Sequence, residues 1–203
     1  MKKMEIRSMN IGKPIELAFG TKQVTTGIQK KPINKPILLT TLNFNGDGQG
    51  DLVHHGGIDK AVCAYPFEHY SYWEEQLGRP LSFGAFGENL TLQGLTEKDL
   101  CIGDSFQLGE AVVQVSQPRQ PCFKLALLYD RKDMPLLVQN SGYTGFYFRV
   151  LQEGMVSPLD ELIPLHSHEK AISVAEANRL MHHDKNDLVG IRQLLEVNEL
   201  SRN

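Results

Sequence analysis

The sequence has no long apolar segment. Of its 203 residues, 41% are hydrophobic and 22% charged, yet no stretch reaches the roughly 18 apolar residues of a membrane-spanning helix. The first residues carry lysines at positions 2 and 3 without the apolar run of a secretory signal. We therefore expect a folded cytoplasmic protein that does not enter a membrane.

Cysteine is scarce as well. There are three, Cys63, Cys101 and Cys122, and no two form a C-x-x-C pair. This excludes a disulfide framework, so each is judged as a thiol. Cys63, in the apolar stretch KAVCAY, and Cys101, before a Gly-Asp turn, are interpreted as small packed residues.

No excess of positive charge is present. The formal net charge is -3, and no dense basic stripe alternates with aromatic residues. We therefore expect no nucleic-acid partner. Residues 1–60 nevertheless hold nine Lys or Arg against five Asp or Glu, which makes this part the better contributor to an anion site.

No internal repeat is visible, and Gly and Pro interrupt the first 165 residues throughout. Short segments between them alternate in polarity or are rich in β-branched and aromatic residues, which predicts strands. The eight segments are MEIRSM, PIELAF, KPILLTTLNF, KAVCAY, NLTLQ, DSFQLG, AVVQVSQ and GFYFRVL. They indicate a mostly β fold with a closed or nearly closed β-barrel over residues 1–165.

Helices are predicted at a few places. Residues 66–78 show helical spacing between Pro66 and a terminal Gly78, and two more helices are expected from Pro121 and after Asp133. Beyond Pro164 the sequence becomes helical, with Ser173 as a capping residue. We expect residues 166–203 to form a small helical domain.

The stretch SQPRQPCFKLA (116–126) places Cys122 directly after Pro121, with Arg119 before it and Lys124 after it. A helix starting at Pro121 would put the thiol in its first turn, where the helix dipole and both cations favour the thiolate. The alternative is a packed thiol of no chemical role.

The loop GDGQGDLVHHGGIDKAV is rich in glycine but lacks the Gly-Lys-Ser/Thr ending of a phosphate-binding loop. The adjacent His54 and His55 point apart in an extended chain and suit one zinc ion poorly. The amides of Gly56 and Gly57, near Lys60, suit an anionic ligand or a solvated turn.

Two further segments are ambiguous. FGENL, with Glu88 and Asn89, is typical of turn chemistry. Arg149 in GFYFRV shares a strand face with Tyr147, so it faces either solvent or a pocket.

Together these segments resemble a MOSC domain of the YiiM-like branch, and the helices after residue 165 resemble its C-terminal helical domain. The resemblance covers nearly the whole chain and depends on the order of five motifs. They are HHGGIDKAV (54–62), FGENL (86–90), GD (103–104), QPRQPCFKL (117–125) and GFYFRV (145–150).

The resemblance implies a MOSC-type β-barrel that binds the molybdenum cofactor, with Cys122 as the protein ligand to molybdenum and the catalytic position. It also implies an oxidoreductase that reduces N-hydroxylated bases or similar small molecules in detoxification, with electrons from a separate donor protein. Thiolate is a soft ligand that suits this metal. For contacts to the anionic cofactor we select the cations Lys60, Arg119 and Arg149 and the neutral groups His55, Gly57 and Asn89.

Two other functions stay open. The same motifs would serve a carrier that binds the molybdenum cofactor without turnover. Cys122 would also serve as a persulfide sulfur carrier that receives sulfur made elsewhere, because the chain has no pyridoxal-phosphate domain. The family's helical domain usually has three helices, whereas NELSRN leaves room for little of a third, so a role in forming a homodimer or docking a partner is also open.

Overall fold

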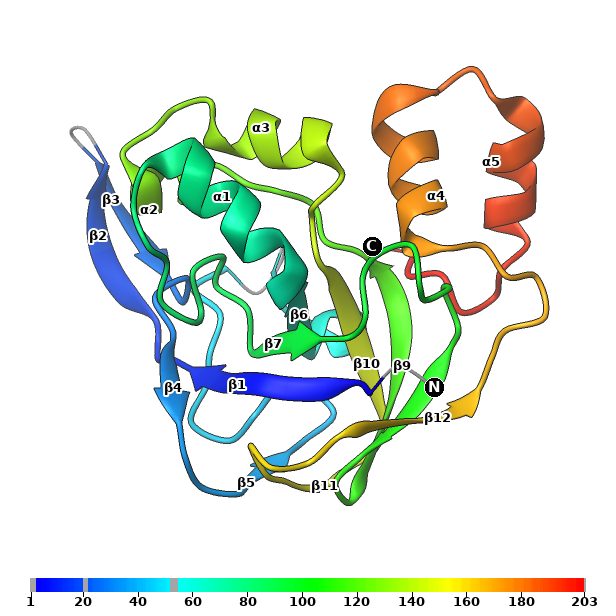
Figure 1. Ribbon diagram of the computed structural model, residues 1–203, viewed down its shortest axis with the longest axis horizontal. Coiled ribbons are helices and arrows are strands. Elements are labelled where there is room, and N and C mark those ends of the chain that lie inside the picture. Colours follow the sequence, from blue (N-terminus) through cyan, green and yellow to red (C-terminus); the bar gives the residue numbers. More distant parts are fainter. Residues whose placement is uncertain (1–2, 20–21, 52–54, 203) are drawn as a thin grey trace.

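The computed structural model describes residues 3–19, 22–51 and 55–202. Most strands form one curled sheet, with helices gathered at one end of it (Figure 1). The strands are β1 (Glu5–Ile11), β2 (Ile15–Phe19), β3 (Lys22–Thr26), β4 (Lys31–Ile33), β5 (Ile37–Leu39), β6 (Val62–Pro66), β7 (Leu90–Gln93), β8 (Ser105–Leu108), β9 (Ala111–Pro118), β10 (Phe146–Gln152), β11 (Gly154–Val156) and β12 (Leu162–His166).

The large sheet has the strand order β12-β8-β9-β10-β6-β7-β1-β4. Its pairs are antiparallel except for β6 and β7, which run parallel. The curl brings β12 back to β1, where Glu5 and Glu161 form a single bridge and the Leu162 amide donates to the Met4 carbonyl. The predicted mostly β, barrel-like fold is thus confirmed as a curled half-barrel sheet.

Each of the eight predicted strand segments contains a strand, but KPILLTTLNF is mostly not one. Only Ile37–Leu39 is extended there, because the Thr40 amide donates to the Asn43 carbonyl and turns the chain. Strands β3, β4, β11 and β12 were not predicted. They are three to five residues long, too short for a clear alternating pattern.

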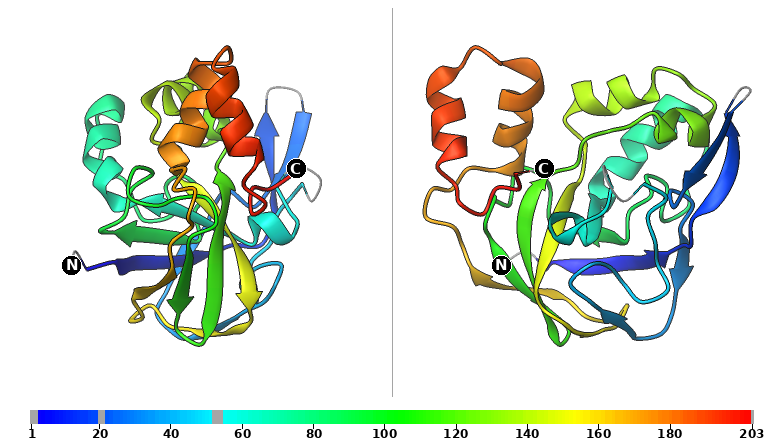
Figure 2. Two further views of the ribbon diagram at one scale, coloured as in Figure 1. Left: turned by 90° about the vertical axis from the view of Figure 1, so that its right-hand side faces the viewer. Right: turned by 180° about the vertical axis from the view of Figure 1, so that it is seen from behind.

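Four helices before β10 lie toward one end of the sheet (Figure 2), namely η2 (Phe67–His69), α1 (Tyr70–Leu77), α2 (Lys124–Tyr129) and α3 (Met134–Ser141). The short helix η1 (Ile58–Lys60) lies beside β9 and β10. The predicted ending of α1 is confirmed, since Gly78 takes the left-handed conformation (φ 64°) and its amide donates to the Glu74 carbonyl. The prediction that a helix begins at Pro121 is wrong, because α2 begins at Lys124.

The C-terminal segment folds into α4 (Val174–Asn178), η3 (Arg179–His183) and α5 (Leu188–Leu195), beside β9 and β10 (Figure 1). The predicted cap at Ser173 is confirmed: its hydroxyl accepts from the Glu176 amide. From Glu196 to Arg202 the described chain makes turns, and no helix follows α5 there. No helix of the described residues is long and apolar enough to span a bilayer.

Two apolar clusters form the core. The larger fills the half-barrel and includes Val174, Leu180 and Leu194 of the C-terminal segment. The smaller lies beneath α1 to α3, around the fully buried Trp73. The C-terminal helices therefore share the core of the half-barrel.

Candidate functional site

A solvent-open pocket with about 560 Å³ of empty space lies near the ends of β6, β9 and β10. Its lining includes five of the seven predicted site residues, His55, Lys60, Asn89, Arg119 and Cys122. Segments far apart in sequence thus meet at one pocket.

Cys122 lies in the turn between β9 and α2. Its carbonyl accepts from the Leu125 amide at 3.0 Å, so the thiol precedes the first helical residue by two positions. The helix starts late because the Arg119 amide still donates to the Gly145 carbonyl, as in a sheet. The chain turns after Arg119, and this turn positions Cys122. The Cys122 thiol is free and half-buried.

Arg119 is deeply placed in the pocket, with a residue exposure of 6%, the same as that of Lys124. Its Nη2 donates to the Phe86 carbonyl at 2.6 Å, but Nη1 is buried and finds no partner among the described residues. A buried guanidinium donor without an acceptor is costly. An anionic group entering the pocket would satisfy it, so the residues present fit an anionic cofactor.

The carbonyl that meets Arg119 is fixed by Glu88, which is fully buried. Its carboxylate accepts from the Gly84 and Phe86 amides and from the Tyr70 and Thr91 hydroxyls. The FGENL motif is therefore a tight turn organised around one carboxylate. The structure agrees with the interpretation of this motif as a turn.

Asn89 lines the pocket, but its amide is used by the protein. Nδ2 donates to Asp47 at 2.8 Å and to the Asn10 carbonyl, while Oδ1 accepts from the Cys63 amide. Asp47 also forms a buried ion pair with Lys30. Asn89 thus stabilises the pocket wall through hydrogen bonds within the protein. The sequence analysis did not predict the ion pair of Lys30 and Asp47, because the two residues lie 17 positions apart in loops without a distinctive sequence pattern.

Other polar groups give the pocket positive charge. Lys60 and the nearly buried Lys124 line it together with Arg119 and the paired Lys30. Among the described residues the lining contains no carboxylate. Burial, followed by the charge of Lys124, lowers the pKa of His55 to about 4, so its imidazole is neutral at pH 7.

Two predicted site residues lie outside the lining. Gly57 is the residue before η1, and its carbonyl accepts from the Lys60 amide. Arg149 donates to Asp59 at 2.8 Å and to Gln114. It lies on the same strand face as Tyr147, but two residues further along β10, which is a distance of roughly 6–7 Å. There its guanidinium pairs with Asp59 of η1.

The remaining sulfur and histidine positions differ in setting. Cys63 lines the pocket, and burial raises its pKa to about 11, so it stays protonated. Cys101 does not line the pocket, and burial raises its pKa too. His54 lies outside the described residues. Within the described ranges no cluster of three or more His, Cys, Asp or Glu has the arrangement of a metal site.

The half-barrel thus carries a pocket that combines a thiol with cations, a combination suited to an anionic ligand that also presents a soft atom. Comparison with family models shows the class of protein. Residues 51–163 match the model of the MOSC domain, and residues 172–203 match that of the YiiM-like, 3-alpha helix domain. The chain belongs to the MOSC domain family, in its YiiM-like branch. MOSC domains are generally associated with binding of the molybdenum cofactor.

Known proteins resemble most of the chain. Uncharacterized protein YflK of Bacillus subtilis (strain 168) is 58% identical over 97% of this chain and 89% of its own. The crystal structure of YiiM from Geobacillus stearothermophilus has a TM-score of 0.83 at 42% identity, covering 98% of this chain and 94% of that one. A protein named "Reductase" from Gibberella moniliformis (strain M3125 / FGSC 7600) is 31% identical over 78% of this chain but only 29% of its own length.

Proposed function

We propose that the protein is a molybdenum-cofactor enzyme that reduces N-hydroxylated bases or similar small N-hydroxylated compounds. The observation that carries the proposal is the buried, unsatisfied Nη1 of Arg119 in the same pocket as the free thiol of Cys122. Such a pocket attracts an anion that also brings a soft metal to the sulfur.

The residues have distinct parts in this proposal. Cys122 is the protein ligand to the metal, and Arg119, Lys60 and Lys124 bind the anionic portion of the cofactor. His55 contributes a neutral hydrogen-bonding group. When bound, the cofactor supplies the two-electron chemistry that turns an N–OH group into an amine and water, and the protein positions it.

Electrons are proposed to come from a separate donor protein. The Gibberella relative named "Reductase" is far longer than the region it shares with this chain. A region similar to this chain within a longer protein named "Reductase" supports an oxidoreductase role, for which we propose a separate protein as the electron donor.

The test is metal and pterin analysis of protein purified anaerobically from cells that make the cofactor. We expect about one molybdenum and one pterin per chain, loss of the metal in Cys122→Ala, and retention in the control Cys101→Ala, whose thiol lies outside the pocket. Stoichiometric molybdenum in Cys122→Ala would contradict the ligand assignment.

A reductase assay separates catalysis from carriage. The loaded protein, given an artificial electron donor and an N-hydroxylated base, is expected to release the amine, and Cys122→Ala is not. Loaded protein without turnover under these conditions would identify a carrier instead of an enzyme.

A further inference from the structure

The C-terminal segment, residues 172–202, contacts residues next to the pocket lining at two separate points. None of its described residues belongs to the pocket lining. Both contacts are made through polar side chains to the main chain or side chains next to the pocket cations Arg119 and Lys60.

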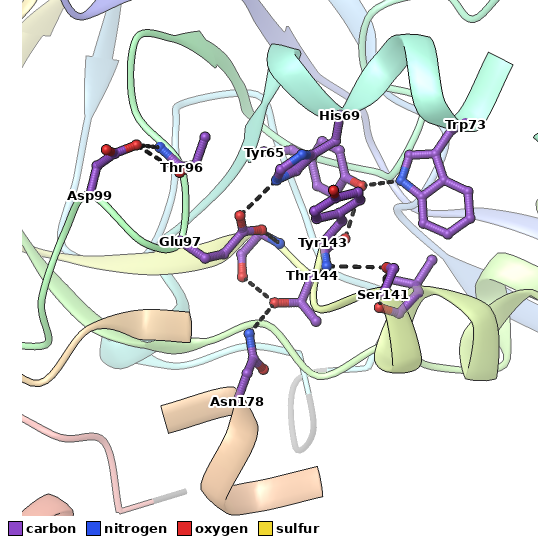
Figure 3. A network of polar contacts seen from close by, with 12 residues as sticks. Tyr65, His69, Trp73, Thr96, Glu97, Asp99, Ser141, Tyr143, Thr144 and Asn178 are labelled. Carbon is purple, nitrogen blue, oxygen red and sulfur yellow. Dashed lines mark hydrogen bonds and ion pairs between the residues drawn. The ribbon is translucent and has the colours of Figure 1, made fainter. Parts of the chain in front are cut away.

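The first contact starts at Asn178 of α4, which is 2% exposed. Its Nδ2 donates to the Thr144 hydroxyl at 2.7 Å, as Figure 3 shows. That hydroxyl donates to the Gly145 carbonyl at 2.9 Å, the same carbonyl that accepts from the Arg119 amide at 3.0 Å. A side chain of α4 is therefore two hydrogen bonds away from the carbonyl that holds Arg119.

Gly145 is held on its other side too. Its amide donates to Glu97 at 2.7 Å, and the second oxygen of Glu97 lies 2.7 Å from His69 Nε2. The His69 ring stacks on Tyr143, with centroids 3.8 Å apart. A Cβ at Gly145 would lie 2.5 Å from the Ala64 carbonyl, at a φ of 74°. These contacts fix the backbone at Gly145, whose carbonyl accepts from the Arg119 amide.

The second contact is made by Ser201. Its amide donates to the Ser116 carbonyl and its hydroxyl to Asp59 Oδ2, both at 3.0 Å. Asp59 precedes Lys60 in η1, and its carbonyl accepts from the Ser116 hydroxyl at 2.6 Å. The chain beyond α5 therefore holds η1, the short helix that carries the pocket cation Lys60.

We propose that the C-terminal segment positions two of the pocket's cations, Arg119 through Asn178 and Thr144, and Lys60 through Ser201 and Asp59. This inference rests on the proposed function, in which these cations bind an anionic cofactor. Cations already fixed before binding give tighter binding, because less freedom is lost when the anion arrives. Asn178, Thr144 and Ser201 are positioning residues, since they touch neither thiol nor pocket.

Hydrogen exchange tests the positioning without any cofactor. Thr144→Val removes the hydroxyl with little change of volume, and Thr144→Ser restores it. We expect the Arg119 amide to exchange roughly fivefold faster in Thr144→Val, with rescue in Thr144→Ser. Ser201→Ala is expected to do the same at the Lys60 amide, with rescue in Ser201→Thr. The control Ser173→Ala removes the α4 cap and is expected to lower stability without this local change.

Molybdenum retention tests the consequence. After long dialysis of protein loaded in cells, Thr144→Val and Ser201→Ala are expected to retain metal roughly tenfold less well than their rescued partners. Absence of molybdenum from the unaltered protein, with the exchange changes present, would reject the proposed function and leave the positioning intact. Equal exchange in each variant and its rescued partner would overturn the inference, whatever the metal content.

Discussion

At the scale of single residues, the pocket contains groups that fold stability alone does not explain. The Arg119 guanidinium is buried, and its Nη1 has no partner among the described residues. Burying such a charge opposes folding. We therefore infer that the Arg119 guanidinium, which lowers stability without a ligand, gains its missing hydrogen-bond acceptor from a bound ligand.

This cost leads to a prediction for Arg119→Met. We expect the cofactor-free variant to be as stable as the unaltered protein, or more stable by about 1–2 kcal/mol, because a long apolar side chain replaces a buried cation whose Nη1 has no acceptor among the described residues. Molybdenum retention is expected to fall at least about tenfold. Urea denaturation and metal analysis measure the two effects.

The control for this prediction is Arg131→Met. Arg131 pairs with Asp133 at the surface, so its loss is expected to change stability by less than about 0.5 kcal/mol and metal content not at all. A strongly destabilised Arg119→Met would mean that Arg119 serves the fold and not a ligand.

At the scale of elements, the pocket depends on turns more than on strands. The segment from Gly84 to Asn89 is closed by Glu88, which fixes the carbonyl of Phe86 against Arg119. The turn before α2 presents Cys122, and η1 presents Lys60. The strands supply the frame from which these turns project.

Glu88→Gln tests the turn. An amide nitrogen replaces one carboxylate oxygen, so at least one bond from the Gly84 or Phe86 amide or from the two hydroxyls is lost inside the core. We expect a loss of about 1–3 kcal/mol in the free energy of unfolding, measured by urea denaturation. Glu74→Gln is the matched control, because the half-buried Glu74 accepts from one amide, that of Leu81. Equal effects in the two variants would contradict a special role for Glu88.

The sequence predicts some of these elements better than others. The C-terminus of α1 is predicted by Gly78 and the N-terminus of α4 by Ser173, because capping depends on local backbone chemistry. The start of α2 does not, since it depends on a hydrogen bond between Arg119 and Gly145, far apart in the chain. The partnership of Arg149 with Asp59 is of the same kind. Local signals locate elements, and long-range contacts decide where the side chains point.

At the scale of the whole molecule, the C-terminal helices and the half-barrel share one core. Leu180 is 3% exposed and belongs to the same apolar cluster as the sheet residues. Main-chain hydrogen bonds also join the two, from Ile102 to Ile172 and from Val174 to Leu100. The predicted division into residues 1–165 and 166–203 stays a prediction, and a shared core makes their joint unfolding the expected behaviour.

Leu180→Ala tests that behaviour. We expect a loss of about 2–4 kcal/mol, and we expect the fluorescence of Trp73 to report the same shift as circular dichroism, although Trp73 lies in the other cluster. Leu195→Ala is the control, because Leu195 is 70% exposed. Two separate transitions in Leu180→Ala would show that the C-terminal segment unfolds by itself.

The edge strand β12 has a consequence for self-association. An edge strand presents unpaired backbone groups that can pair with another chain, and apolar side chains on it add to this risk. In β12 the side chains of Ile163 and Leu165 are exposed. The Leu162 amide points away from β8, toward Met4, so alternation directs the nitrogen of Pro164 to the same open side. Proline has no N–H to offer there. The edge of β12 therefore lacks one N–H donor that an added strand would use, which disfavours edge-to-edge pairing with another chain at this strand.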